Sequence, residues 1–397
     1  MHLADIDVVS SEVYSGDVPY EQFSLLRRQA PVFKQRIPDP NLVDEAWVIS
    51  RYEDVRTVSL DPETFSSASG TTLRAQRPAR ILPGVFIGLD DPEHGRLRSL
   101  VARGLTPRAV KAFEQHYREL TARVIDKALA NDRFDFVTEI SAELPLLAIC
   151  ELLGVPDADR RRVFQWSNAI LGAEDPEYAG TPESAGRAVM ELAAYAGMLA
   201  EDRRQAPRDD VMSVLANDAD LTDRELEGFA VLMLSAGNET TRNNISHGLL
   251  ALLQHPDQLA ALRAEPDRYL DGAVEEITRW ATPVNYMARR ATRDAVLGGQ
   301  QVRAGEWVAL FYGSANRDED AFAHADRFDI ERSPNNHVAF GVGKHFCLGA
   351  NLARIETSIM FSELLPRADL RVVGSVRRLA SSFIRGVKEL PVAATRL

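Results

Sequence analysis

The chain has 397 residues and only two cysteines, Cys150 and Cys347, far apart in the sequence, which excludes a disulfide-stapled scaffold, a four-cysteine zinc site and a Cys-x-x-Cys redox pair. Hydrophobic residues make up 45% of the chain and charged residues 26%, as in an ordinary globular protein. The formal net charge of −12 opposes binding to nucleic acids or to anionic membranes.

The first part of the chain mixes predicted strands and helices. Residues 47–50 predict a short strand, followed by a helix that runs to about Leu60. Residues 64–91 are rich in Ser, Gly and Pro and predict a long ordered loop, of the kind that lies over a binding site. From Pro92 to Ile170 apolar residues recur at spacings of three and four, which predicts helices.

The rest of the chain is predicted to be helical and then to change to strands after Pro283. The predicted helices cover 181–204, 222–254 with Thr222 as N-cap, 256–281, and 348–365. The predicted strands cover 287–292, 301–305 and 307–312, and the chain ends in a hairpin-like segment. Because strands and helices do not alternate regularly, we expect a mainly α fold with small β-sheets.

We expect one domain over residues 1–397, since no Gly/Ser-rich linker or repeat divides the chain. A β-rich lobe is expected mainly at 30–60 and 284–312 plus a C-terminal sheet, and an α-rich lobe elsewhere. The N-terminus lacks the features of a secretory signal, and no apolar run approaches the ~18 residues needed to cross a bilayer. The expectation is a cytoplasmic protein without a membrane span.

The most informative stretch is a Gly-punctuated loop that delivers Cys347 to the start of a helix. A thiolate there is stabilised by the helix dipole and by free N–H groups, which lowers its pKa and suits it to bind a metal. Glycines such as Gly349 let the backbone approach a flat ligand, against which Phe340 can pack. Cys150 lies in an apolar helical run and is expected to be a packing residue.

This loop has the pattern Phe-x-x-Gly-x-x-x-Cys-x-Gly at 340–349, which resembles the haem-binding signature of the cytochrome P450 family at every defining position. Glu276 and Arg279, at i and i+3, resemble the family's Glu-x-x-Arg, and Arg332 resembles the third member of that structural ion-pair cluster. The resemblance covers essentially the whole chain. It implies the triangular, mainly helical cytochrome P450 fold, haem b as cofactor, and Cys347 as the axial ligand of the iron.

Haem carries two propionates, and their burial in an acidic protein requires local cations. His94 and Arg98 stand at i and i+4 on one face of a predicted helix. The resemblance adds Arg289 and His345 to this set. Arg290 follows Arg289 along a strand and should face the other way, so motif register favours Arg289, although the choice between the two arginines stays open.

The centre of the long predicted helix contains residues that are poor helix formers, above all Gly237. Taken alone, Thr240 would be a packing residue bonded to the backbone. The segment resembles the acid–alcohol pair of the family, which implies that Gly237 leaves room for dioxygen, that Thr240 bonds to a carbonyl and holds a water, and that Glu239 relays protons. This pair implies a monooxygenase that activates O2.

The two electrons for that reaction are expected to come from NAD(P)H through a separate ferredoxin and ferredoxin reductase, because nothing in the chain resembles a flavin or ferredoxin module. One set of basic residues either docks an acidic ferredoxin or forms a solvated basic face. The set is Arg96, Arg98, Arg103, Arg108, Lys111 and Lys344.

The segments expected to line a substrate pocket are apolar, which favours a lipophilic substrate. The predicted pocket residues are Val85, Phe86, Leu171, Val284 and Met287. Several stretches, such as 237–248, resemble the actinobacterial branch that hydroxylates methyl-branched lipids, steroids and terpenoids. Two alternatives stay open: a tailoring oxidase of polyketide or peptide natural products, and a non-catalytic haem carrier or gas sensor.

Overall fold

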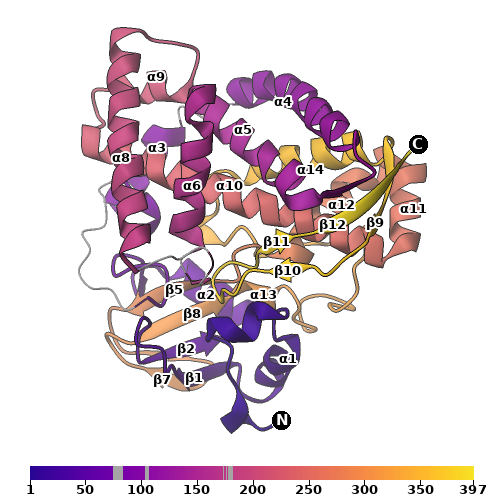
Figure 1. Ribbon diagram of the computed structural model, residues 1–397. Coiled ribbons are helices and arrows are strands. Elements are labelled where there is room, and N and C mark those ends of the chain that lie inside the picture. The colour runs from indigo at the N-terminus through magenta and orange to yellow at the C-terminus, as the bar shows by residue number, and fades with distance from the viewer. Residues whose placement is uncertain (75–83, 103–106, 173, 176, 178–181) are drawn as a thin grey trace.

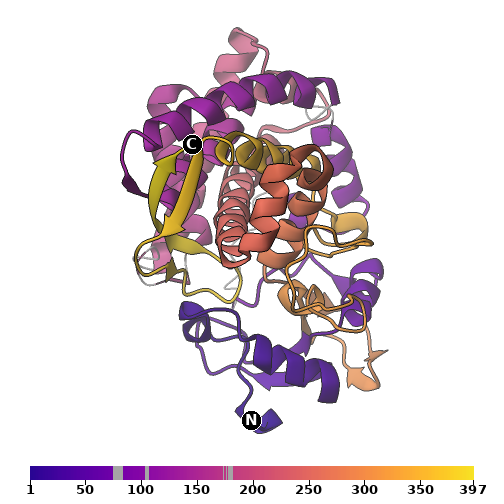
Figure 2. The ribbon, with the colours of Figure 1, turned by 90° about the vertical axis from the view of Figure 1, so that its right-hand side faces the viewer.

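The computed structural model describes residues 1–74, 84–102, 107–172, 174–175, 177 and 182–397. Helices fill the upper part of the molecule in Figure 1, and the largest sheet lies below them beside the N-terminus. Figure 2 shows the same division from the side, with the C-terminal strands against the helices.

Helices make up most of the described structure. They are α1 Tyr20–Gln29, α2 Tyr52–Leu60, α3 Glu93–Ala102, α4 Pro107–Ala128, α5 Glu143–Leu152, α6 Arg160–Leu171, α8 Pro182–Gln205, α9 Val211–Ala216, α10 Asp223–Gln254, α11 Pro256–Ala264, α12 Pro266–Ala281, α13 Tyr312–Ala315 and α14 Ala350–Leu364.

The largest described sheet has the strand order β1-β2-β8-β5-β3, in which β2 and β8 are parallel and the other neighbours antiparallel. Its strands are β1 Val32–Arg36, β2 Glu45–Ile49, β3 Phe65–Ser66, β5 Tyr286–Ala291 and β8 Trp307–Phe311. Smaller sheets pair β4 Arg133–Asp135 and β9 Ala368–Val372 with β12 Pro391–Arg396, β6 Ala295–Leu297 with β7 Gln300–Val302, and β10 Arg377–Arg378 with β11 Val387–Glu389.

The longest described helix, α10, begins as its sequence predicts. Thr222 Oγ1 accepts from the backbone N–H of Glu225 at 3.4 Å, and Glu225 Oε2 accepts from Thr222 N–H at 2.9 Å, which completes a capping box. Further along, a Cβ at Gly248 would lie 2.7 Å from Ile277 of α12 and 2.9 Å from Phe361 of α14. Gly248 therefore lets α10 pass close to both helices.

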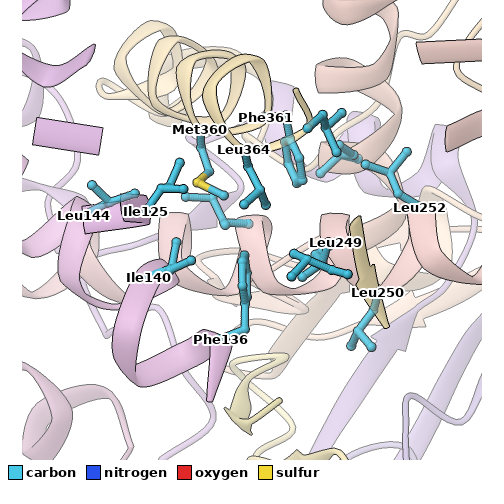
Figure 3. Packing of buried hydrophobic residues seen from close by; sticks show 14 of the residues in the cluster. Ile125, Phe136, Ile140, Leu144, Leu249, Leu250, Leu252, Met360, Phe361 and Leu364 are labelled. Atoms are coloured by element: carbon cyan, nitrogen blue, oxygen red, sulfur yellow. The ribbon is translucent and has the colours of Figure 1, made fainter. Parts of the chain in front are cut away.

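The main hydrophobic core lies where α10 meets α4, α5 and α14. Figure 3 shows Phe361 and Leu364 of α14 pointing toward Leu249 of α10, with Phe136 and Ile140 closing the other side. All five side chains are almost completely buried. This packing holds the middle of α10 rigidly between the helices that flank it.

The mainly α fold with small sheets is confirmed, and most predicted elements lie within a few residues of the observed ones. The helical prediction over 92–170 is wrong at β4, and within this region the turn at Val137–Ser141 is π-helical. β4 exists because it pairs with β12 from the other end of the chain, a contact that local periodicity does not encode. Among the described residues no helix combines the length and apolarity that crossing a membrane requires.

Candidate active site

Cys347 is placed by a loop that turns back on itself before α14. Gly341 and Gly343 have φ values of 71° and 74°, in the left-handed region that favours glycine. The backbone N–H of Cys347 donates to the carbonyl of Phe340 at 2.8 Å, which closes the loop. A Cβ at Gly343 would lie 3.0 Å from the backbone oxygen of Ser59, so the loop also packs closely on α2.

The thiol of Cys347 corrects one expectation. Burial raises its pKa, although the N–H of Gly349 and the charges of Arg98 and Arg354 act in the opposite direction. The direction is opposite to the expected lowering, because desolvation of the sulfur outweighs these three contributions to the pKa. Cys347 nevertheless has an exposed surface, and a coordinated metal would deprotonate such a thiol outright.

The four side chains predicted to bind the propionates lie within electrostatic reach of one another. The rings of His94 and His345 are 4.2 Å apart, centroid to centroid. Arg98 Nη2 donates to the carbonyl of Phe346 at 2.7 Å, next to the cysteine. The pKa of His345 is lowered to about 3, first by burial and then by the charges of Arg289, His94 and Arg98.

These residues fit a dianionic group. His94 is 2% exposed, and its Nε2 is buried without a hydrogen-bond partner among the described residues. Burial also lowers the pKa of Arg289, whose Nη1 donates to the carbonyl of Ala288 at 2.7 Å. Arg289 is a buried cation, Arg98 is a partly buried one, and burial lowers the pKa of both histidines. An anion placed among them would compensate the arginines and accept hydrogen bonds from the rings, and two propionates beside a cysteine sulfur supply such an anion. The donor set thus suits haem.

The two neighbouring arginines on β5 point to opposite faces of the strand. Arg289 is 5% exposed and faces inward, whereas Arg290 is exposed and its Nε donates to the carbonyl of Gly305 at 3.0 Å. The alternation of side chains along a strand explains the difference. Arg289 is therefore the member of this pair that lies with His345.

The middle of α10 presents one less covered face. Met233, Ala236, Gly237 and Thr240 are partly exposed there and are spaced by three and four residues, so they share a face. Thr240 Oγ1 donates to the carbonyl of Ala236 at 2.7 Å, which is the predicted bond to the backbone.

Gly237 is not required by protein packing at this point. A Cβ there would make an ordinary contact of 3.4 Å with Ile149 of α5. Any need for glycine must then come from what occupies the less covered face of α10.

Two residues missed by the sequence analysis, Arg242 and Asn243, contact Glu239. Glu239 is 2% exposed, and its Oε1 accepts from Arg242 Nη2 and, at 3.1 Å, from Asn243 Nδ2. The spacings i+3 and i+4 from Glu239 were a signal that could have identified both residues.

A third missed residue is Glu356 of α14, a fully enclosed carboxyl. Burial raises its pKa well above the usual value, and a hydrogen bond with Thr241 only partly offsets this. Nothing in its local sequence signals that burial.

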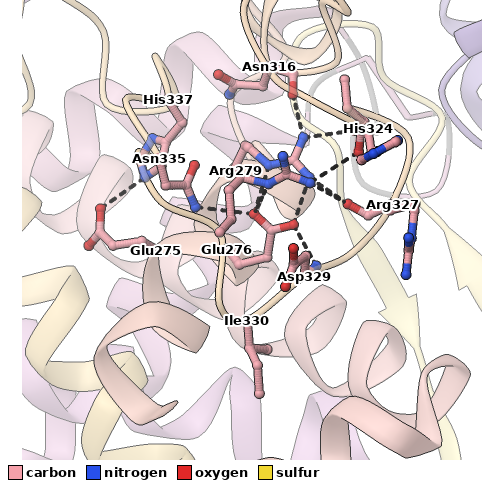
Figure 4. A network of polar contacts seen from close by, with 12 residues as sticks. Glu275, Glu276, Arg279, Asn316, His324, Arg327, Asp329, Ile330, Asn335 and His337 are labelled. Atoms are coloured by element: carbon pink, nitrogen blue, oxygen red, sulfur yellow. Dashed lines mark hydrogen bonds and ion pairs between the residues drawn. The ribbon is translucent and has the colours of Figure 1, made fainter. Parts of the chain in front are cut away.

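The ion-pair cluster predicted from Glu-x-x-Arg is assembled in the structure (Figure 4). Glu276 and Arg279 are both 0% exposed and form a two-pronged pair with distances of 2.7 and 2.8 Å. Arg332 Nε lies 3.1 Å from Glu276 Oε2. The cluster fixes the segment after α13 against α12.

The remaining predicted site residues differ in how far they are buried and in what they contact. Phe340 packs against Arg354, 4.7 Å from its ring centroid, and no side-chain or backbone atom lies within 4 Å of a Cβ built on Gly349. Phe86 is 5% exposed and belongs to a core cluster with α8 and α10. The other predicted pocket residues, which are Val85, Leu171, Val284 and Met287, are partly buried.

The predicted basic set is partly neutralised where the structure describes it. Arg96 pairs with Glu225, and Lys344 pairs with Asp91. Arg103 lies outside the described residues, as do the side chains of Arg108 and Lys111. A groove of 810 Å³ lies beside the cysteine loop, and its lining includes the cations of Arg56 and Arg354.

Comparison with known proteins gives consistent matches. The model of the family described as Cytochrome P450 matches residues 184–381. A steroid C26-monooxygenase of Rhodococcus jostii is 42% identical, and the alignment covers 97% of this chain and 84% of that enzyme. A methyl-branched lipid omega-hydroxylase of Mycobacterium tuberculosis is also 42% identical, and the alignment covers 98% of this chain and 95% of that enzyme. A Mycobacterium marinum cytochrome P450 in complex with pseudoionone has a TM-score of 0.90, 37% identity and 98% coverage of both chains.

Proposed function

The chain belongs to the cytochrome P450 family, and we propose that it hydroxylates a C–H bond of a lipid, steroid or terpenoid substrate. Near full-length similarity to two enzymes named for steroid and branched-lipid oxidation carries this proposal. The apolar character of Leu171, Val284 and Met287 is consistent with it.

In this proposal haem b would be held by Cys347 and by the cluster of His94, Arg98, Arg289 and His345, and it would supply reductive activation of O2. The overall reaction consumes the substrate, one O2, two electrons and two protons, and yields the hydroxylated product and one water. We assign proton movement to this chain's own groups. Thr240 Oγ1 uses its hydrogen for the carbonyl of Ala236, so its lone pairs are free to accept a hydrogen bond from a water.

The second group of this relay is Glu239. Its Oε2 is buried and has no hydrogen-bond partner among the described residues. In this proposal Glu239 Oε2 takes up a proton from solvent and then passes it to that water, which returns the carboxylate to its ionised form.

The experiment for the substrate is a binding screen on purified ferric protein across fatty acids, branched lipids, sterols and terpenes. We expect a low-spin to high-spin shift with members of one of these classes and a single hydroxylated product from the same compound. A spin shift only with polyketides or peptides, or binding without any product, would contradict the proposed substrate class or the enzymatic role.

We further propose a ferredoxin and its reductase as the electron source and the cytoplasm as the location. Arg56 and Arg354 line the groove beside the cysteine loop, where they pair with Glu53 and Glu275 of the same lining. An acidic donor would compete with these carboxylates for the two cations. Reconstitution with a ferredoxin should give a turnover rate that falls as ionic strength rises, and cell fractionation checks the location.

Substitution of Arg289 should weaken haem retention, whereas substitution of its neighbour should not. In Arg289→Gln one buried cation is lost from the propionate cluster, and we expect haem transfer to apomyoglobin to be about tenfold faster or more. Arg290→Gln is the matched control, since Arg290 is exposed on the other face of β5. Equal transfer rates for the two variants would remove Arg289 from the cluster.

Thr240→Ala should uncouple electron consumption from hydroxylation. Without the hydroxyl the relay water loses its support, so product per NAD(P)H is expected to fall by about tenfold or more while hydrogen peroxide accumulates. Thr240→Ser should retain most of the coupling. Thr241→Ala, one residue along the same helix, serves as the control; coupling that falls equally in it would argue for a general packing defect.

A further inference from the structure

Glu239 is held through only one of its two carboxylate oxygens. Oε1 accepts from the guanidinium of Arg242, in an ion pair whose side chains are 2% and 6% exposed, and from the amide of Asn243. Oε2 is equally buried and has no partner among the described residues. Two donors on one oxygen fix the orientation of the carboxylate and leave the other oxygen available.

The first donor reaches a second helix. Arg242 Nη1 donates to the side-chain oxygen of Asn168 at 3.1 Å. Asn168 lies on α6, which ends at the predicted pocket residue Leu171. The position of α6 therefore affects where the guanidinium can lie beside Glu239.

The second donor reaches the C-terminal strands. Asn243 Oδ1 accepts from the backbone N–H of Val387 on β11 at 3.0 Å. The segment that joins β10 to β11 contains Ile384, which forms a β-bridge with the predicted pocket residue Val284. Helix α6, which carries the predicted pocket residue Leu171, and strand β11 are thus both linked to Glu239 Oε1, through Arg242 and Asn243 respectively.

We propose that Arg242 and Asn243 are positioning residues for proton delivery: they hold Glu239 by Oε1, leave Oε2 as the oxygen that exchanges protons, and link this orientation to α6 at Asn168 and to β11 at Val387. The guanidinium also compensates the charge of a carboxylate that is buried in the protein. Neither residue touches the reacting atoms. Both act through Glu239.

This inference rests on the proposed function, and a double-substitution cycle on the complete holoenzyme tests it. We expect Glu239→Gln to slow NAD(P)H-dependent product formation by about 10²-fold and Arg242→Gln by about 10-fold. The double variant Glu239→Gln/Arg242→Gln should be no slower than Glu239→Gln alone, because Arg242 acts through Glu239. Losses that multiply to about 10³-fold would overturn the inference.

Measurements that do not depend on turnover accompany the cycle. Arg242→Gln leaves the buried carboxylate of Glu239 without its ion-pair partner, so the melting temperature of this variant should fall by roughly 5–10 °C. Adding Glu239→Gln to it should restore part of that loss. Asn243→Ala should speed amide hydrogen exchange at Val387. Unchanged melting in Arg242→Gln, or unchanged exchange in Asn243→Ala, would contradict the contacts on which the inference depends.

Further variants separate positioning from general disruption. Arg242→Lys keeps the cation and should recover part of the rate that Arg242→Gln loses. Asn168→Ala should slow product formation, as Arg242→Gln does. Its substrate dissociation constant, measured from the spin shift, should stay within about threefold of that of the unaltered enzyme. Arg161→Gln, an exposed position on α6, should match the unaltered enzyme. A rate in Asn168→Ala equal to that of Arg161→Gln would overturn the link to α6.

The proposed function and this inference fail in different ways. An unaltered enzyme that forms no hydroxylated product with any lipophilic compound overturns both. An unaltered enzyme that forms product, combined with an Arg242→Gln rate within twofold of it, overturns the inference alone.

Discussion

Replacement of Cys347 by serine is expected to abolish monooxygenase activity and the spectral signature of the thiolate. The reduced carbon-monoxide complex of the unaltered protein should show a red-shifted Soret band, because the cysteine sulfur donates electron density to the iron. Serine cannot supply this density, so the band should return to the position of an ordinary haem protein. Product formation should fall below detection, since a bound haem would lose the thiolate ligand on which its activation of O2 depends.

The second cysteine of the chain supplies the control. Cys150 is 0% exposed, belongs to a core cluster, and has a pKa raised to about 12 by burial. Cys150→Ala should keep both the red-shifted band and the activity. A red-shifted band that persists in Cys347→Ser would show that another side chain binds the iron.

For Cys347 the shape of the loop could be predicted from the sequence, but the pKa of the thiol could not. The glycines around Cys347 predict a tight loop that presents the sulfur, and the observed loop has this form because Gly341 and Gly343 adopt left-handed φ values. The pKa of the thiol was expected to be lowered and is instead raised by burial. Burial depends on every segment that packs around the sulfur, whereas the helix dipole is a local property.

Polar contacts within one helix could be predicted from residue spacing. Contacts between elements, such as that of Arg332 with Glu276, could be expected only from the family resemblance. The i+3 spacing of Glu276 and Arg279 predicts their pair, and the spacing of Glu239 and Arg242 would have predicted theirs. The bond from Arg242 to Asn168 joins helices far apart in the sequence. Spacing within one element carries no information about such a partner.

Replacement of Glu276 by glutamine is the substitution expected to affect folding most. The two oxygens of Glu276 accept from both prongs of Arg279, from Arg332 Nε, and from Asn335 Nδ2 and the N–H of Asp329, at distances of 2.7 to 3.1 Å (Figure 4). Glutamine has nearly the same shape but removes the charge that compensates two buried guanidinium groups. Breaking such a buried pair costs about 3–5 kcal/mol, out of a typical total stability of about 5–15 kcal/mol.

We therefore expect Glu276→Gln to yield little folded protein, or a urea midpoint far below that of the unaltered chain with a similar denaturant slope. The neighbouring Glu275→Gln is the matched control on the same helix. Glu275 is 31% exposed in its side chain and pairs with Arg354 and His337, so its loss should cost about 1 kcal/mol because solvent screens the pair. Equal midpoints for the two variants would mean that Glu276 does not compensate the buried arginines. Arg279 Nη1 also donates to the carbonyls of Asn316 and Ala325, at the start of the segment between α13 and the cysteine loop. A large difference between the two midpoints would therefore mean that the Glu276 carboxylate stabilises this whole segment by holding Arg279.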